Sequence, residues 1–120
     1  MKQDGFYLRH IADAIAKIEQ YASVGRETFL GQSHWHDAAI RQLEIIGEAT
    51  KKLSPELKDQ HPDIPWRRVA GLRDVLIHDY FGVDLAMVWG VIQKDIPLLR
   101  DKIHSMLGQM PPGAGNPDQS

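Results

Sequence analysis

The sequence contains no cysteine, which excludes a disulfide framework, a thiolate nucleophile and any cysteine-based metal site. Long apolar runs are also missing, since none approaches the roughly 20 residues that a membrane-spanning helix requires. The segment Met1 to Phe6 is polar and lacks the apolar core of a signal peptide. We therefore expect a soluble, cytoplasmic protein that makes no membrane contact.

An excess of positive charge is missing as well. Lysine and arginine total 14 against 16 acidic residues, giving a net charge of −2. Non-specific coating of nucleic acid depends on neutralising phosphates, so this balance argues against it. A local basic patch remains possible in the middle third of the chain, although a solvated helix surface is the favoured interpretation of charge alone. The residues concerned are Lys51, Lys52, Lys58, Arg67, Arg68 and Arg73.

The main feature that the sequence does contain is the spacing of apolar residues that is typical of amphipathic helices. Its 120 residues, 42% of them hydrophobic, are typical of one globular domain. Apolar residues recur at steps of three and four through most of residues 1–107, whereas residues 108–120 are rich in proline and small polar residues. We predict one all-α domain over residues 1–107, an antiparallel bundle of four to five helices, followed by a disordered tail.

The expected helices follow from the same spacing and from capping residues. Residues 23–33 are expected to form a connecting loop, with Phe29 and Leu30 tucked onto the core. Ser54 should cap a short helix that begins at Pro55. Gly82 should cap the helix before it, and Asp84 the helix after it. The predicted longer helices span residues 6–22, 65–80 and 84–107, the last of them bent by Pro97, and a further one starts near residues 33–37 and runs to residue 53.

Two residues of the second long helix suggest close contacts. Gly47 lies in mid-helix, where glycine costs about 1 kcal/mol relative to alanine. This suggests that another helix approaches it closely, although simple tolerance of the glycine explains it nearly as well. Ile45 adds a second apolar edge to the stripe. That edge would either face a partner or simply widen the surface that faces the core, and the spacing favours neither interpretation.

Residues 71–82 carry the side chains best suited to chemistry. On a regular helix Arg73 and Tyr80 share one face, while Asp74 and His78, four residues apart, share the adjoining face. Histidine titrates near neutrality and can move protons at cellular pH, and arginine binds phosphate through two hydrogen bonds. Arg73 and His78 together suggest work on a phosphodiester.

A structural role for these residues competes with that interpretation. Basic side chains near a helix C-terminus interact favourably with the helix dipole, and Arg73 could pair with Asp74 or Asp79 on the surface. Spacing alone favours this role. Arg73 and His78 lie about 140° apart around a helix and do not share a face. A two-fold homodimer, which would gather two arginines and two histidines in one cleft, or an unwound helix end would close that gap.

Metal binding has little support in the sequence. The His34-Trp35-His36 run offers two imidazoles but places no third ligand. Asp79 and Asp84 flank Gly82 and could hold Mg²⁺, yet helix capping already accounts for Asp84. We expect no metal and no cofactor. The remaining histidines, which are most simply surface residues, are His10, His61 and His104.

The run from Arg73 to Tyr80 resembles the R-x4-H-x-Y signature of HepT-like toxins in the HEPN superfamily. The likeness extends over residues 43–49, over Ile64-Pro65-Trp66 with residues 70–72, and from residue 78 through Trp89. It covers roughly residues 5–107. An isolated R-x4-H pattern would be weak, but this series of motifs in the same order is a strong signal.

This resemblance implies a helical homodimer that is a metal-independent endoribonuclease, with Arg73 and His78 as catalytic residues at the dimer cleft. It implies regulation by an antitoxin, an MNT-type nucleotidyltransferase that adds AMP to Tyr80. The position after the arginine is often asparagine in the family, whereas Asp74 here adds negative charge and would orient or tune His78. RNA would be cleaved by attack of its 2′-hydroxyl, and an adduct on Tyr80 would block the face that Arg73 presents to RNA.

Two interpretations from other classes remain open. A non-catalytic HEPN module could bind nucleotide or RNA and dock a nucleotidyltransferase, which the low net charge slightly favours. A purely structural dimerising bundle would use Arg73, His78 and Tyr80 as helix-end residues.

Overall fold

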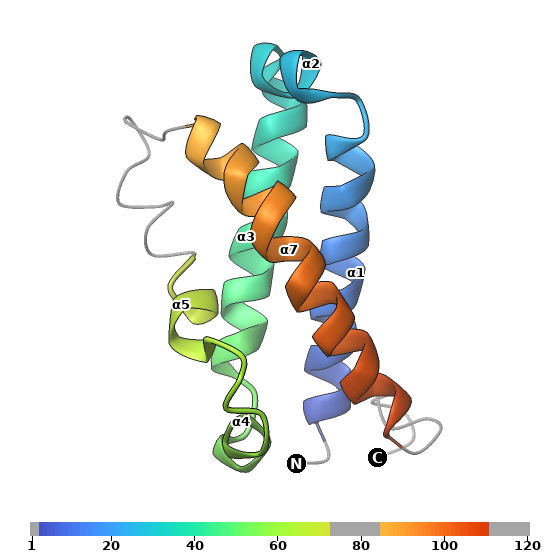
Figure 1. Ribbon diagram of the computed structural model, residues 1–120, viewed down its shortest axis with the longest axis vertical. Coiled ribbons are helices and arrows are strands. Elements are labelled where there is room, and N and C mark those ends of the chain that lie inside the picture. The colour runs from blue at the N-terminus through green and yellow to red at the C-terminus, as the bar shows by residue number, and fades with distance from the viewer. Residues whose placement is uncertain (1–2, 73–84, 111–120) are drawn as a thin grey trace.

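The computed structural model describes residues 3–72 and 85–110, which are helical with short connections (Figure 1). Three long helices, α1 (Asp4–Ala22), α3 (Ser33–Lys51) and α7 (Leu85–Gly108), form the body. Three short ones, α2 (Arg26–Gly31), α4 (Pro55–Gln60) and α5 (Trp66–Ala70), lie in the connections. These ranges contain no strand, so the all-α prediction is confirmed. The number of helices in the whole chain and the homodimer stay predictions.

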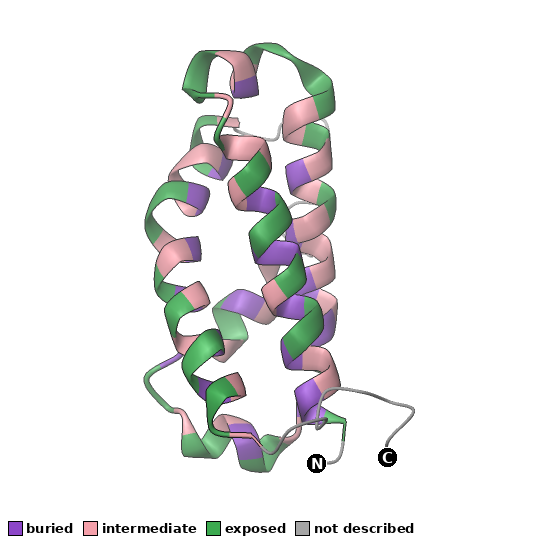
Figure 2. Cartoon of the chain, turned by 90° about the vertical axis from the view of Figure 1, so that its right-hand side faces the viewer, coloured by how far each residue is buried: buried purple, intermediate pink, exposed green. Residues whose placement is uncertain are grey.

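The core forms where the three long helices meet. In Figure 1, α1 and α3 run side by side and α7 crosses both, and Figure 2 shows the buried positions turned inward. Most of the aliphatic residues that recur at steps of three and four in these helices are buried, as predicted, whereas Ile40, Leu85, Val91 and Leu107 are half-buried. Full burial of one such side chain stabilises the fold by about 1.5–3 kcal/mol. Ile96 and Met106 also belong to this core, although the periodicity did not select them. Fully buried members include Leu8, Ile11, Ile18, Leu43, Ile46 and Ile103.

The predicted loop over residues 23–33 is wrong, because these residues contain the helix α2. Gly25 precedes α2 with a φ of 96°, a left-handed conformation that glycine adopts without strain. The Phe29 N–H donates to the Gly25 carbonyl across 2.9 Å. The Phe29 side chain is fully buried, which confirms its predicted place on the core. Burial of this one aromatic ring therefore holds α2 in place. With six residues, α2 is too short for a hydrophobic period to be recognised in the sequence.

The uninterrupted helix predicted over residues 65–80 is also wrong. The helix α5 ends at Ala70, and Gly71 forms a turn before Leu72 is helical again. The Gly71 N–H donates to the Arg67 carbonyl across 3.0 Å, and a Cβ at Gly71 would lie only 3.3 Å from that oxygen. The tight backbone contact favours glycine at this position, where the helix gives way to a turn just before the motif. The predicted caps Gly82 and Asp84 lie outside the described residues.

Ser54 caps α4 as predicted and also ties two distant parts of the chain together. Its Oγ accepts a hydrogen bond from the Leu57 N–H at 3.2 Å. The same residue donates twice to the buried carboxylate of Asp4, from its N–H at 2.8 Å and from its Oγ at 2.5 Å. The start of α1 is thus fastened to the start of α4.

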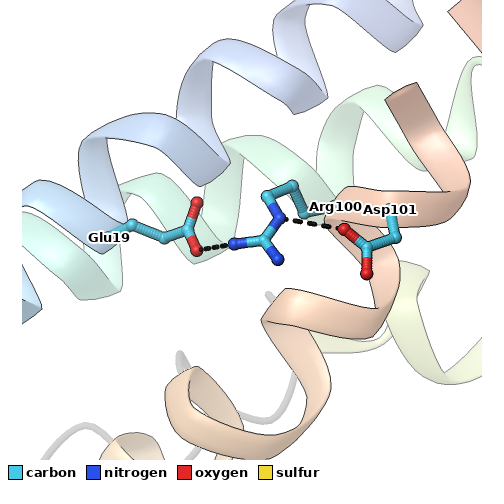
Figure 3. Close-up of polar contacts among 3 residues, drawn as sticks. All are labelled: Glu19, Arg100 and Asp101. Atoms are coloured by element: carbon cyan, nitrogen blue, oxygen red, sulfur yellow. Dashed lines mark hydrogen bonds and ion pairs between the residues drawn. The ribbon is translucent and has the colours of Figure 1, made fainter.

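A second polar link joins α1 to α7 near the middle of α7 (Figure 3). Arg100 donates through Nη1 to Glu19 at 2.5 Å and through Nε to Asp101 at 3.1 Å. The hydrogen bond to Asp101 and the charge of Glu19 raise the pKa of Arg100 above its usual value, so the guanidinium stays charged. The link between the helices is therefore a permanent ion pair at the surface of the bundle.

The helix α7 runs through Pro97 without ending there. Its bend at that residue stays a prediction. Most of the predicted tail, residues 111–120, lies outside the described residues. Within the described ranges no helix is long and apolar enough to cross a membrane.

Candidate functional site

Arg73, Asp74, His78 and Tyr80 all lie in residues 73–84, outside the described part of the chain. The structure therefore does not test which of these side chains come together. It does describe the elements on both sides of the motif, and these fix where the segment begins and ends.

The segment begins after a firmly anchored connection. Ile64 is buried, and its carbonyl accepts a hydrogen bond from the Trp66 N–H at 2.8 Å. The Trp66 indole Nε1 donates to the carbonyls of His61, at 3.0 Å, and Lys58, at 3.2 Å. Val69 on α5 is buried. The Ile64-Pro65-Trp66 motif, which belongs to the family resemblance, thus lies in a connection that is anchored to the rest of the fold.

The segment ends at an equally well packed helix. Val88, in the first turn of α7, is almost completely buried. One residue later, the Trp89 ring packs against Phe29 of α2 with ring centroids 5.1 Å apart. The first turns of α7 are therefore held against the end of the bundle that carries α2.

Two ion pairs join the entry side to α7. Arg68 on α5 donates to Asp95 on α7 at 3.0 Å, and Lys102 on α7 donates to Asp63, just before α5. The hydrogen bond from Lys102 holds the pKa of the Asp63 carboxyl below its usual value. Between the pairs lies an apolar groove of about 160 Å³, whose lining includes Ile64, Val69, Leu72, Val91, Ile96 and Leu99.

The resembling α3 motif, residues 43–49, faces both the core and the surface. Gly47 is buried, and the close approach of another helix at this residue stays a prediction. Ile45 is half-buried and packs against the core. It also lines a polar pocket of about 340 Å³ between α1 and α3, together with Tyr7 and Glu44. The second apolar edge thus serves the core in part, and its use by a partner stays open.

The basic residues of the middle third are solvent-facing where they are described. Lys51, Lys52, Arg67 and Arg68 are exposed and Lys58 is half-buried. Arg68 is paired with Asp95, so this surface is not a uniform cationic patch.

The His34-Trp35-His36 run does not assemble a metal site with other described residues. The His36 Nδ1 lies 3.1 Å from the Phe29 carbonyl, which can only accept, so Nδ1 carries the proton in this contact. His34 is exposed and its ring lies beside that of Trp35, with centroids 4.8 Å apart. In residues 3–72 and 85–110, no group of three His, Cys, Asp or Glu side chains is placed to hold a metal ion.

Sequence reasoning missed an aromatic cluster at the same end of the bundle. The Tyr21 ring of α1 lies 6.4 Å from the Trp35 ring of α3, centroid to centroid. Periodicity counted Trp35 only as part of a histidine-rich run and gave Tyr21 no role. The sequence signal that could have predicted this cluster is a pair of aromatic residues at the facing ends of two adjacent helices. Using it requires knowing beforehand that these two helices pack side by side.

A helical bundle that holds an R-x4-H-x-Y segment between two anchored flanks defines the class of HEPN-like proteins. Comparison with known proteins agrees. Residues 11–106 match the family model described as Ribonuclease HepT-like, and the chain belongs to that family.

Similar curated proteins carry ribonuclease names. The chain is 46% identical over 101 residues to the Probable ribonuclease HepT of Thermococcus cleftensis, covering 83% of this chain and 92% of that protein. It is 40% identical over 108 residues to a protein of Caldanaerobacter subterraneus subsp. tengcongensis named as a putative RNase, covering 89% and 96%.

A longer relative comes from Methanocaldococcus jannaschii and is named Gamma-glutamylcyclotransferase and putative RNase. It is 41% identical over 111 residues, which are 92% of this chain but only 50% of that protein. The chain therefore spans half the length of this relative. No solved structure gives a significant match.

Proposed function

We propose that this protein is a metal-independent endoribonuclease that acts as the toxin of a toxin–antitoxin pair. Its membership of the Ribonuclease HepT-like family is the observation that carries this proposal. The intact motif residues Arg73, His78 and Tyr80 support it. The anchored flanks support it further, because a catalytic segment must be held in place at both ends.

In the proposed reaction the RNA supplies its own nucleophile. The 2′-oxygen attacks the adjacent phosphorus, the bond to the 5′-oxygen breaks, and a 2′,3′-cyclic phosphate remains. His78 exchanges the protons, taking one from the 2′-hydroxyl or giving one to the leaving 5′-oxygen. Arg73 stabilises the charge that builds on the phosphate, and Asp74 orients His78 or tunes its pKa.

Tyr80 is the proposed control point. A nucleotidyltransferase partner would transfer AMP from ATP to the Tyr80 hydroxyl, forming a phosphodiester and releasing pyrophosphate. The adduct places negative charge and bulk beside Arg73, where RNA phosphate must bind. A homodimer would bring two copies of Arg73 and His78 to one cleft and remove the angular gap between them.

The test is cleavage of single-stranded RNA by the purified full-length protein. His78→Ala and Arg73→Ala should each lower cleavage at least roughly 100-fold while leaving a folded helical protein. His104→Ala and Arg67→Ala are matched controls, because both residues are exposed in the described structure. Cleavage should persist in EDTA, yield cyclic phosphate ends, and fail on an RNA whose riboses are 2′-deoxy at the cut position.

Two results would decide against the proposal. Unchanged cleavage by both motif variants would remove Arg73 and His78 from the chemistry. RNA binding with no cleavage by the wild-type protein would favour the non-catalytic HEPN module. Regulation is tested separately: co-expression with the nucleotidyltransferase should add AMP mass to the wild-type chain and none to Tyr80→Phe.

A further inference from the structure

An aromatic surface is formed where the C-terminal end of α1 meets the N-terminal end of α3. Tyr21 and Trp35 are both half-buried and lie with ring centroids 6.4 Å apart. His34 extends the surface outward, with its ring 4.8 Å from that of Trp35. Three planar side chains therefore adjoin one another at one end of the bundle, and each keeps part of its surface in solvent.

Packing accounts for these rings only in part, because Tyr21 and Trp35 pack against the core and yet stay half-exposed, while His34 is exposed. The buried aromatic residue at this end is Phe29, which is fully enclosed and contacts Trp89 of α7. Trp35 is instead oriented by a hydrogen bond from its indole Nε1 to the exposed Gln32 side chain at 3.2 Å. A half-buried indole whose Nε1 is held by a hydrogen bond offers a fixed aromatic ring that is suited to stacking on another planar group.

Two cationic residues lie near Tyr21 along the chain. Lys17 precedes Tyr21 by four residues on α1, so the two side chains are neighbours on one face of the helix. Arg26 begins α2, five residues after Tyr21. Both are exposed, and within residues 3–72 and 85–110 neither is engaged in an ion pair. Acidic residues are also nearby in the sequence, namely Asp13, Glu19, Glu27 and Asp37, so the surface is mixed in charge.

The helix that follows the motif segment packs at the same end of the bundle as this surface. The chain leaves residue 84 directly into α7, and Trp89, in the second turn of α7, packs on Phe29 of α2. Phe29 in turn contacts His36 of α3, with ring centroids 6.4 Å apart. The helix that follows the motif therefore starts at the end of the bundle that carries Trp35.

From these features we infer that Tyr21, His34 and Trp35 form a stacking surface for unpaired bases of single-stranded RNA, flanked by Lys17 and Arg26 as phosphate contacts. Stacking accepts any base, since every base has a planar face, and it is unavailable to bases inside a duplex. The surface would hold RNA outside the cleavage site and favour single strands as substrate. The inference rests on the proposed ribonuclease function.

The test measures binding of a labelled RNA of about 12 nucleotides, as a single strand and as a duplex, by fluorescence anisotropy. A His78→Ala background prevents cleavage during the measurement. Trp35→Ala should raise the Kd for the single strand roughly 5- to 150-fold and leave duplex binding unchanged. Trp35→Phe, which keeps an aromatic face, should retain most of the affinity. Tyr7→Ala, which changes an aromatic residue at the opposite end of α1, should bind as the parent protein does.

Further variants keep the result interpretable if Trp35→Ala unfolds. His34 is exposed, so His34→Ala should weaken single-strand binding without changing the melting temperature. Lys17→Ala and Arg26→Ala should each lower the dependence of log Kd on log salt by about one phosphate contact.

Three outcomes would overturn the inference. One is unchanged single-strand affinity in Trp35→Ala and His34→Ala. Another is an equal loss for single strand and duplex, which would indicate backbone binding only. The third is a change of mass in sedimentation that accounts for the lost binding, which would make this surface an interface between copies of the chain. Binding is measured apart from cleavage. A catalytically inactive wild type would therefore refute the ribonuclease proposal, while the binding data would still decide whether this surface stacks on single-stranded RNA.

Discussion

Arg68 and Asp95 lie 3.0 Å apart and join the two elements that flank the motif segment. Arg68 belongs to α5, which ends three residues before Arg73, and Asp95 belongs to α7, which begins directly after residue 84. Both side chains are largely solvated, at 68% and 43% exposure. The contact therefore closes the loop of chain that carries the motif, but water and salt weaken it.

We expect Arg68→Ala and Asp95→Ala each to lower the free energy of unfolding only slightly, with a coupling of about 0.2–1 kcal/mol between them. A double-mutant cycle measured by urea unfolding gives this coupling, and it should shrink in high salt. Arg67→Ala is the control, because Arg67 is an exposed neighbour with no ion pair among the described residues. A coupling of zero at low salt would show that the contact does not form in solution.

The Asp4 and Ser54 side chains should matter more, because Asp4 is buried and accepts two hydrogen bonds from Ser54. Asp4→Ala leaves the Ser54 N–H without that acceptor, so we expect a loss of about 1–3 kcal/mol in the free energy of unfolding. Asp4→Asn retains one acceptor oxygen and should cost less. Ser54→Ala keeps the backbone N–H bond to Asp4 but removes the hydroxyl bond and also the cap of α4, which alone is worth about 0.5–2 kcal/mol. Equal effects of Asp4→Ala and Asp4→Asn would contradict this account.

The long helices could be predicted from the sequence because their signal is local. Aliphatic residues spaced by three and four identify the buried face of α1 without reference to any other element. The same rule extended the helix from residue 65 to residue 80, since it does not sense the backbone contact at Gly71. It also left α2 as a loop, because six residues are too few for a period and the helix depends on burying Phe29.

Contacts between distant residues could not be predicted in this way. Asp4 meets Ser54 across 50 positions and Glu19 meets Arg100 across 81, and neither partner carries a local sign of the other. The same distinction between local signals and long-range contacts applies to the candidate site. Its residue types and order follow from Arg73, His78 and Tyr80 in the sequence, whereas their mutual geometry depends on how segments meet and stays a prediction.

The ion pair between Asp63 and Lys102 should make stability depend on pH in the acid range. Lys102 lowers the pKa of Asp63 below its usual value of 3.8, so the folded state binds this proton less readily than the unfolded state does. The stability that this ion pair adds to the folded state is therefore fully present above pH 3.8. It is lost as the pH falls through the lower pKa that Asp63 has in the folded state. The melting temperature of Asp63→Asn should lie below that of the wild type near neutrality, and the two should converge in strong acid. A difference that grew on acidification would have the wrong sign.

Phe29 provides the strongest stability prediction, because a single buried ring holds α2 against both α3 and α7. Its side chain is fully enclosed and contacts the rings of Trp89 and His36. Phe29→Ala should lower the free energy of unfolding by about 3–5 kcal/mol, since it removes a large apolar group and leaves a cavity. Leu98→Ala is the matched control: Leu98 is 63% exposed and its loss should change stability by less than about 0.5 kcal/mol. Denaturant unfolding followed by circular dichroism measures both, and similar effects of the two variants would show that residues 26–31 are not packed on the core as a helix.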